Sequence, residues 1–208
     1  MDGPFCYFTT MLFIPKFIFS YLLLFSASVS MPTLLVNEKK FDPYTLDPAL
    51  LVPKKATPMS QQDIVHALCK AYEKEYSVLP SNNILALSWA QVALENNRGK
   101  KIWNNNLGNQ GPFRMDQEYY HHLRGGWPYR SFAEPEESGR SYWRVIKKCT
   151  MAFQAFKMGD PALAASALKK CNYYSSDEQA YSKSLTSLYY EAKSRLNLDV
   201  DCGKKNNR

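Results

Sequence analysis

The stretch "LALSWAQVALENNRGK", Leu85–Lys100, predicts the centre of the fold. Its apolar residues cover almost the whole circumference of a helix, which is typical of a helix buried in the middle of its domain. Ser81 or Asn82 supplies an N-terminal cap, and Gly99 follows a short run of asparagines that ends the helix. We therefore expect a central buried helix with Glu95 in its last turn.

Segments on both sides of this helix also predict helices, separated by one irregular region. Helical periodicity and caps mark a helix from Ser60 to near Ser77, one continuous helix from Pro135 to Gly159, a short helix after Asp160-Pro161, and a last helix capped by Ser176 or Asp177. Residues 104–132 lack this periodicity and contain two strand-like pieces, so they predict a small loop-rich or β lobe with a hairpin. The expected fold is mainly α, an α+β arrangement of a helical domain with a small lobe.

The N-terminal region predicts a cleaved signal segment followed by a separate arm. Lys16 precedes the apolar run "FIFSYLLLFSASVS", which has the length and small-residue end of a secretory signal. We expect a signal peptide over residues 1–30, with an uncleaved anchor as the alternative. Five prolines then indicate a linker or a wrapping arm over residues 31–59. One domain over residues 60–200 and a basic tail over residues 201–208 complete the expected organisation.

The net charge and the cysteines indicate which kind of partner and which cellular compartment to expect. The formal net charge of +7 suggests an anionic partner such as cell wall, a membrane surface or nucleic acid, although it also serves simple solubility. Four cysteines follow the predicted signal, at positions 69, 149, 171 and 202. They predict either two disulfides, with three possible connectivities, or free buried thiols. Their spacing matches no zinc motif, so we expect no metal and no cofactor.

Glu95 is the residue with the clearest chemistry. Burial disfavours a carboxylate, and so does the partial negative charge at a helix C-terminus, so both effects raise the expected pKa. A carboxyl group that stays protonated near neutral pH can act as a general acid. The adjacent loop is rich in asparagine, including Asn104, Asn105, Asn106 and Asn109, and such amides can hydrogen-bond sugar hydroxyl groups. The alternative is a solvated helix end followed by ordinary turns.

Four segments together resemble the glucosaminidase-type peptidoglycan hydrolases of the lysozyme-like superfamily. In chain order they are "LALSWAQVALENNRGK", "NNNLGN", "YRSFAEPEESGRSYWRVI" and "AASALKKCNYYSSDEQAYSKSL". The resemblance covers roughly residues 60 to 196 and implies a lysozyme-like fold. The sequence departs from the family pattern directly after Glu95, where it reads "NNRG", and in the loop that reads "NLGN".

The resemblance also implies roles for individual residues. Glu95 matches the catalytic acid, and Asn106 matches the family's loop asparagine, with Asn109 as a further substrate-binding residue. Tyr173 or Tyr174 matches the active-site tyrosine that contacts the sugar, with core packing as the alternative. Two further tyrosines, Tyr142 and Tyr181, match positions that we expect to be structural.

A second catalytic carboxylate is harder to assign. Asp116 and Glu118 are the candidates in the predicted lobe, and Glu134 is a more distant third. A second carboxylate would permit inversion or a covalent intermediate. Without one, the alternatives are attack by the substrate's own acetamido group and a single Glu that serves as acid and then base.

The resemblance implies an exported enzyme that cleaves the β-1,4 glycan backbone of the bacterial cell wall, as a β-N-acetylglucosaminidase or a muramidase. Alternatives are a lytic transglycosylase, a non-catalytic glycan-binding module, and a basic secreted protein acting on membranes or nucleic acid. We expect peptidoglycan strands as the partner, no nucleic-acid partner, no stable membrane insertion after signal cleavage, a monomer, and a secreted or periplasmic location.

Overall fold

The computed structural model describes residues 48–111, 120–124 and 127–202. Contacts between Cα atoms divide the chain into two units, residues 1–39 and residues 40–208, and all described residues belong to the second. The predicted signal peptide, most of the predicted arm and most of the basic tail lie outside the described residues.

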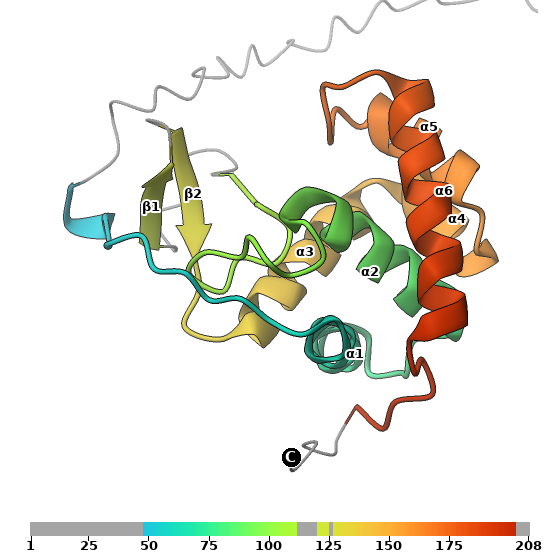
Figure 1. The fold of residues 1–208 in the computed structure, drawn as a ribbon, viewed down its shortest axis with the longest axis horizontal. Helices are drawn as coiled ribbons and strands as arrows, with labels where there is room; N and C mark the ends of the chain where they lie inside the picture. Colours follow the sequence, from blue (N-terminus) through green and yellow to red (C-terminus); the bar gives the residue numbers. More distant parts are fainter. Residues whose placement is uncertain (1–47, 112–119, 125–126, 203–208) are drawn as a thin grey trace, which may run out of the picture. The chain divides into compact units, whose positions relative to one another are not determined.

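Helix α2, Asn82–Asn96, forms the centre of the helical part, as predicted. The side-chain oxygen of Ser81 caps its first turn by accepting a hydrogen bond from the main-chain N–H of Ile84. Every residue from Ile84 to Ala93 is buried, because α2 has neighbours on all sides. The last helix, α6 (Glu178–Arg195), packs along it, and Figure 1 shows the two side by side.

Helices α1, Gln61–Tyr76, and α3, Pro135–Lys148, form a second closely packed pair. A Cβ atom at Gly139 of α3 would lie 2.7 Å from the Cβ of Ala71 on α1, closer than two such atoms approach. Glycine at this position therefore lets the two helix backbones come close together.

The predicted continuous helix from Pro135 to Gly159 was wrong in one respect, because the chain breaks it at Cys149. This residue has φ −92° and ψ 77°, and that ψ lies far outside the helical region. A new helix, α4 (Thr150–Met158), follows and packs against α5 (Pro161–Lys170) and α2. Periodicity in the sequence does not reveal a break of one residue.

The remaining caps follow the predictions. Asp160 accepts a hydrogen bond from the N–H of Leu163 at the start of α5, and Pro161 occupies the first helical turn. Asp177 caps α6 in the same way through the N–H of Ala180. Between α5 and α6, residues 171–176 form a turn with no regular structure.

The predicted lobe contains one antiparallel hairpin of strands β1, Tyr120–Arg124, and β2, Trp127–Ser131. The hairpin lies away from α4, α5 and α6 (Figure 1). The mainly α fold with a small β lobe is thus confirmed.

The described part of the N-terminal arm wraps against the lobe. It begins with a short 3₁₀ helix, η2 (Pro48–Leu50), and continues as extended chain. Its main chain pairs with the loop after α2: the N–H of Thr57 donates to the carbonyl of Ile102 (3.0 Å), and the N–H of Met59 donates to that of Gly99 (3.1 Å). Gly99 has φ +86°, and an added Cβ there would lie 2.3 Å from the Met59 carbonyl oxygen. The arm and the end of α2 therefore depend on glycine at this position.

Two disulfides join the four cysteines, Cys69 to Cys202 and Cys149 to Cys171. The first pins the segment after α6 to α1, and the second pins the end of α5 to the start of α4. Among the described residues, no helix combines the length and apolarity that crossing a membrane requires.

Candidate active site

A groove of about 1730 Å³ lies between the end of α2, the loop 108–111, α3 and the turn between α5 and α6. Glu95 is the only acidic side chain among the described residues that line it. The lining also includes Asn109, Tyr173 and Tyr174, so four of the predicted site residues come together here.

Glu95 occupies the last turn of α2 and is partly exposed to the groove. Burial raises the pKa of its carboxyl group above the ordinary value of 4.5, while the nearby guanidinium of Arg124 opposes part of that rise. The direction is the one expected from the sequence. A carboxyl group in this position holds its proton to a higher pH than a solvated one.

Asn109 connects Glu95 to the lobe. Its side-chain NH₂ donates to the main-chain carbonyl of Glu95, and its side-chain oxygen accepts a hydrogen bond from Arg124 on β1. Arg124 in turn lies over the ring of Tyr129, 4.5 Å from the ring centre. The hairpin is therefore tied to the end of α2 through one amide.

The other loop asparagines serve the chain itself. Asn104 accepts a hydrogen bond from the N–H of Lys55 and donates to the carbonyl of Pro53, so it holds the arm. Asn105 donates to two carbonyls between β2 and α3, those of Phe132 and Ala133. Asn104, Asn105 and Asn109 all have positive φ, a conformation that asparagine tolerates well.

Asn106, predicted to bind substrate, does not line the groove. It is 1% exposed, its NH₂ donates to the carbonyls of Gln110 and Arg130, and its oxygen accepts the N–H of Gln110. With both ends of the amide engaged inside the protein, Asn106 fixes the shape of the loop.

The two adjacent tyrosines differ in their surroundings. Tyr174 donates to the carbonyl of Ala165 and stacks on Tyr181 with ring centres 3.6 Å apart. The hydroxyl of Tyr173 packs near Gly108, and burial together with the charge of Glu95 raises the pKa of that phenol. Tyr173 is thus the one of the pair that lies close to Glu95.

A buried polar contact supports this region from below. Gln91, one turn before Glu95 on α2, accepts a hydrogen bond of 2.6 Å from the hydroxyl of Tyr142. Both residues are fully buried, and burial holds the pKa of Tyr142 well above its ordinary value. Gln91 was not among the predicted site residues, although a polar residue one turn before Glu95 on an otherwise apolar helix was a visible signal.

Arg124 and the buried cluster of Gln110, Arg130 and Ser141 were also missed. The Arg130 guanidinium donates to the Ser141 hydroxyl (2.8 Å), and that hydroxyl donates to the side-chain oxygen of Gln110 (2.6 Å). All three line the groove and hold β2 against α3. An arginine inside a strand-like piece gave no sequence signal of this contact.

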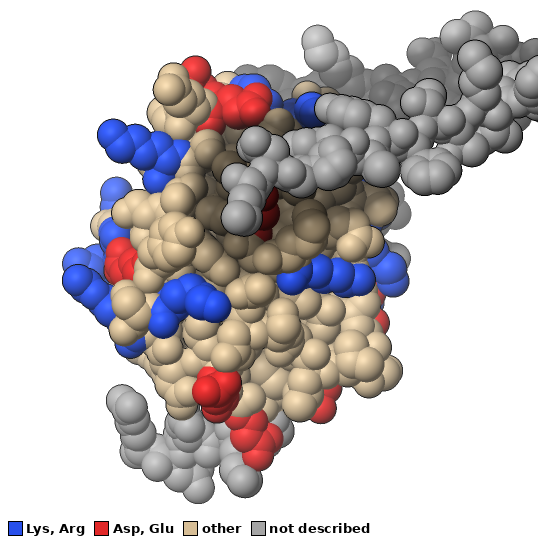
Figure 2. Space-filling view, turned by 90° about the vertical axis from the view of Figure 1, so that its right-hand side faces the viewer, with Lys and Arg blue, Asp and Glu red and all other residues tan. Residues whose placement is uncertain are grey.

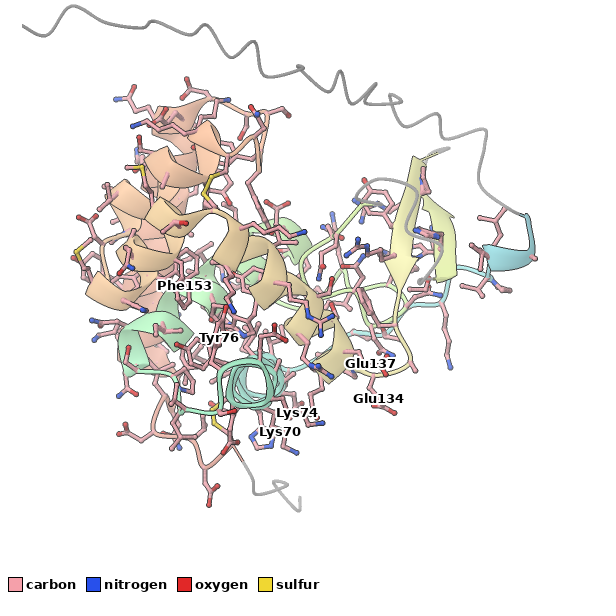
Figure 3. All side chains as sticks on the ribbon, turned by 180° about the vertical axis from the view of Figure 1, so that it is seen from behind. Lys70, Lys74, Tyr76, Glu134, Glu137 and Phe153 are labelled. Atoms are coloured by element: carbon pink, nitrogen blue, oxygen red, sulfur yellow. A yellow bond between two sulfur atoms is a disulfide. The ribbon has the colours of Figure 1, made fainter. Side chains whose placement is uncertain are left out.

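The second-carboxylate candidates are not brought to the groove by any described contact. Asp116 and Glu118 lie outside the described residues. Glu134 is exposed at the N-terminal end of α3, beside Glu137 (Figure 3), and does not line the groove.

Basic side chains surround the groove. Arg144 and Lys148 of α3 and Lys169 of α5 are part of its lining. Figure 2 shows a hollow on one face of the molecule with acidic atoms at its floor, mostly uncharged walls, and Lys and Arg side chains on the surrounding surface. No group of three metal-ligating side chains occurs within the described ranges.

No protein-family model and no curated protein sequence matches the chain. Among solved structures, a peptidoglycan hydrolase mutant from Sphingomonas sp. A1 is similar, with a TM-score of 0.45 and 17% identity over 62% of this chain and 92% of that one. The glycoside hydrolase domain of FlgJ from Salmonella typhimurium is similar with a TM-score of 0.46 and 16% identity, over 65% of this chain and 90% of that one.

Proposed function

We propose that the chain is an exported glycosidase that cleaves the β-1,4 glycan backbone of peptidoglycan, with Glu95 as the general acid. The observation that carries the proposal is the position of Glu95: a carboxyl group with a raised pKa, at the end of a buried helix, in a groove with no second described acid. Breaking a glycosidic bond requires a proton on the leaving oxygen, and a protonated carboxyl group supplies it.

The size of the groove suits a polymer. Sites for single small molecules are commonly about 300–1,000 Å³, and this groove is larger. Tyr173 and Tyr174 on one wall supply the amphipathic surface that a sugar ring packs against, with Tyr173 nearer the proton donor.

In the proposed reaction, Glu95 gives its proton to the glycosidic oxygen as the bond between that oxygen and C1 breaks. Positive charge then develops at C1. An incoming hydroxyl oxygen bonds to C1 and returns its proton to the Glu95 carboxylate. Water as the incoming group gives hydrolysis, whereas the sugar's own 6-hydroxyl gives an anhydro end and a lytic transglycosylase.

Transglycosylation needs no second carboxylate, and Glu95 is the only carboxylate among the described lining residues. Hydrolysis with a second carboxylate would use Asp116 or Glu118. Asp116→Asn and Glu118→Gln, assayed singly, therefore separate the two: a large loss in either favours the two-carboxylate reaction, and no loss with anhydro products favours transglycosylation. Mass spectrometry of the released ends also identifies which bond is cut.

Export is part of the proposal. Two disulfides suit an oxidising compartment, where such bonds persist. We therefore expect the protein outside the cytoplasm, in the periplasm or secreted, with peptidoglycan strands as its partner.

The test is lysis of purified sacculi by the wild type, Glu95→Gln and the control Glu73→Gln, an exposed glutamate on α1. We expect Glu95→Gln to lose about 10²- to 10⁴-fold in rate and Glu73→Gln to retain full activity. Equal lysis by all three would exclude Glu95 as the acid. Binding to sacculi without any released fragments from the wild type would instead indicate a glycan-binding module.

A further inference from the structure

One wall of the groove carries an excess of positive charge. Arg144, Lys148 and Lys169, here called the basic wall, line the groove that contains Glu95 as its only described acid. The disulfide between Cys149 and Cys171 brings two of these residues together, because Lys148 directly precedes Cys149 and Lys169 lies two residues before Cys171.

The three cations differ in how much of their charge is neutralised. Arg144 donates to the carboxylate of Glu75 at 3.2 Å, so its charge is largely paired. Lys169 donates to the carbonyls of Ser175 and Ser176, which are neutral acceptors and leave its charge in place. Lys148 is exposed and forms no ion pair with any residue that the structure describes.

Glu95 is the acid of the described lining that opposes this positive charge. Burial raises the pKa of this carboxyl group, so the acid stays neutral further up the pH scale than a solvated glutamate. The groove then presents two unneutralised ammonium groups on the same lining as the proposed proton donor. Such a surface attracts carboxylates and offers no matching gain to an uncharged chain.

We infer that the basic wall binds carboxylates carried by the glycan, so that the groove selects an anionic glycan over a neutral glycan with the same β-1,4 backbone. This inference rests on the proposed function for the location of the glycan. It adds the charge of the substrate and assigns its recognition to Lys148 and Lys169.

The chain provides matched controls. Lys147 and Lys170 are exposed neighbours of the two lysines in sequence, and neither lines the groove. A Lys147→Gln/Lys170→Gln pair therefore removes the same charge from the molecule as Lys148→Gln/Lys169→Gln and spares the basic wall. Lys169→Arg keeps the charge and changes only the geometry of the group that donates to the carbonyls of residues 175 and 176, so it reports whether an altered contact with the turn alone disturbs binding.

Binding is measured on the full chain with Glu95→Gln in every variant, so that no probe is consumed. The anionic probe is a muramic-acid-containing glycan oligomer with free carboxylates, and the neutral probe is an N-acetylglucosamine oligomer of equal length. We expect Lys148→Gln/Lys169→Gln to weaken binding of the anionic probe about tenfold, as two partly exposed ion pairs imply. Binding of the neutral probe, and binding by the control pair, should stay within twofold.

Equal weakening for both probes, an equal effect of the control pair, or no binding of the anionic probe would each overturn the inference. Salt adds a second readout, since the affinity for the anionic probe should fall with ionic strength more steeply before the two lysines are removed than after. A failure of the proposed function gives a different result. The wild type would then release no fragments from sacculi, although it would still bind the anionic probe more tightly than the neutral one. Cleavage without a charge preference would defeat this inference alone.

Discussion

The guanidinium of Arg124 lies 3.1 Å from the side-chain oxygen of Asn109, and the NH₂ of the same amide donates to the carbonyl of Glu95. The hairpin thus places a positive charge near the acid at the end of α2. Within the part of the chain that the structure describes, no direct ion pair joins Arg124 to Glu95. Asn109 bridges Arg124 and the main chain of Glu95. The acid's proton affinity accordingly reflects both its burial and the position of β1.

Arg124→Gln should move the alkaline limit of activity to higher pH. A general acid works only while protonated, and removing the cation makes Glu95 harder to ionise, so its pKa rises further. The measurement is the pH profile of kcat/KM on solubilised wall fragments. Arg124→Lys retains the charge and should leave the limit near that of the wild type; a shift to lower pH in Arg124→Gln would contradict this account.

Glu95→Gln should stabilise the protein at neutral pH while it lowers the rate of lysis about 10²- to 10⁴-fold. The folded state holds the carboxyl proton more tightly than the unfolded state, so the native protein loses stability as pH rises through the unfolded and then the folded pKa. A neutral amide removes that loss, so the free energy of unfolding at pH 7 should be higher for Glu95→Gln than for the wild type. Urea unfolding at pH 4 and pH 7 tests it, because the gain should be smaller at pH 4.

His122→Asn should reduce the amount by which the free energy of unfolding falls in acid. His122 on β1 is 1% exposed, and burial together with the charge of Arg124 lowers its pKa to about 4. The unfolded chain takes up this proton near pH 6.5, so stability falls as pH drops from 6.5 towards 4. Asparagine can keep the contact that the ring nitrogen makes with Ser131.

The expected difference between wild type and His122→Asn is roughly 2 kcal/mol in the change of unfolding free energy between pH 7 and pH 4. The variant also loses the stacking of His122 on Tyr129, so its stability at pH 7 should be lower. Parallel pH dependences in the two proteins would show that His122 does not carry the effect.

Removal of either disulfide should lower the free energy of unfolding, but only removal of Cys149–Cys171 should change KM. Cys149→Ala/Cys171→Ala opens a loop of 22 residues and should cost about 3 kcal/mol, and it should also raise KM because it frees the turn that carries Tyr173. Cys69→Ala/Cys202→Ala opens a span of 133 residues and should cost more, about 5 kcal/mol, with KM unchanged. Unfolding curves and steady-state kinetics on the same preparations give both numbers. A reversed order of the KM effects would remove the turn from substrate binding.

Local signals in the sequence predicted the helices well because caps and periodicity act within a few residues. Ser81, Asp160 and Asp177 cap their helices through contacts three residues ahead, which a sequence displays directly. The break at Cys149 was missed because a departure from helical dihedral angles at one residue leaves the periodicity of the apolar residues almost unchanged. Disulfide connectivity was open because it depends on how the helices pack together.

Features of the candidate site that depend on a single helix could be predicted from the sequence. Glu95 followed from the composition of a single helix, including the direction of its pKa shift. The asparagine loop was harder, because partners such as Lys55 and Phe132 lie 49 and 27 residues away from the amides that they engage. Composition could not tell an amide that faces a ligand from one that holds the chain.

The contact between Asn104 and the arm bears on where a minimal fragment can begin. The amide of Asn104 is held by Pro53 and Lys55, upstream of the first long helix. A recombinant piece starting at Ser60 would retain every α-helix of the described chain, yet the loop that contains Asn104 would lose its hydrogen bonds to the arm. Shortened versions intended for crystallisation or engineering should therefore include the chain from Pro48 onward.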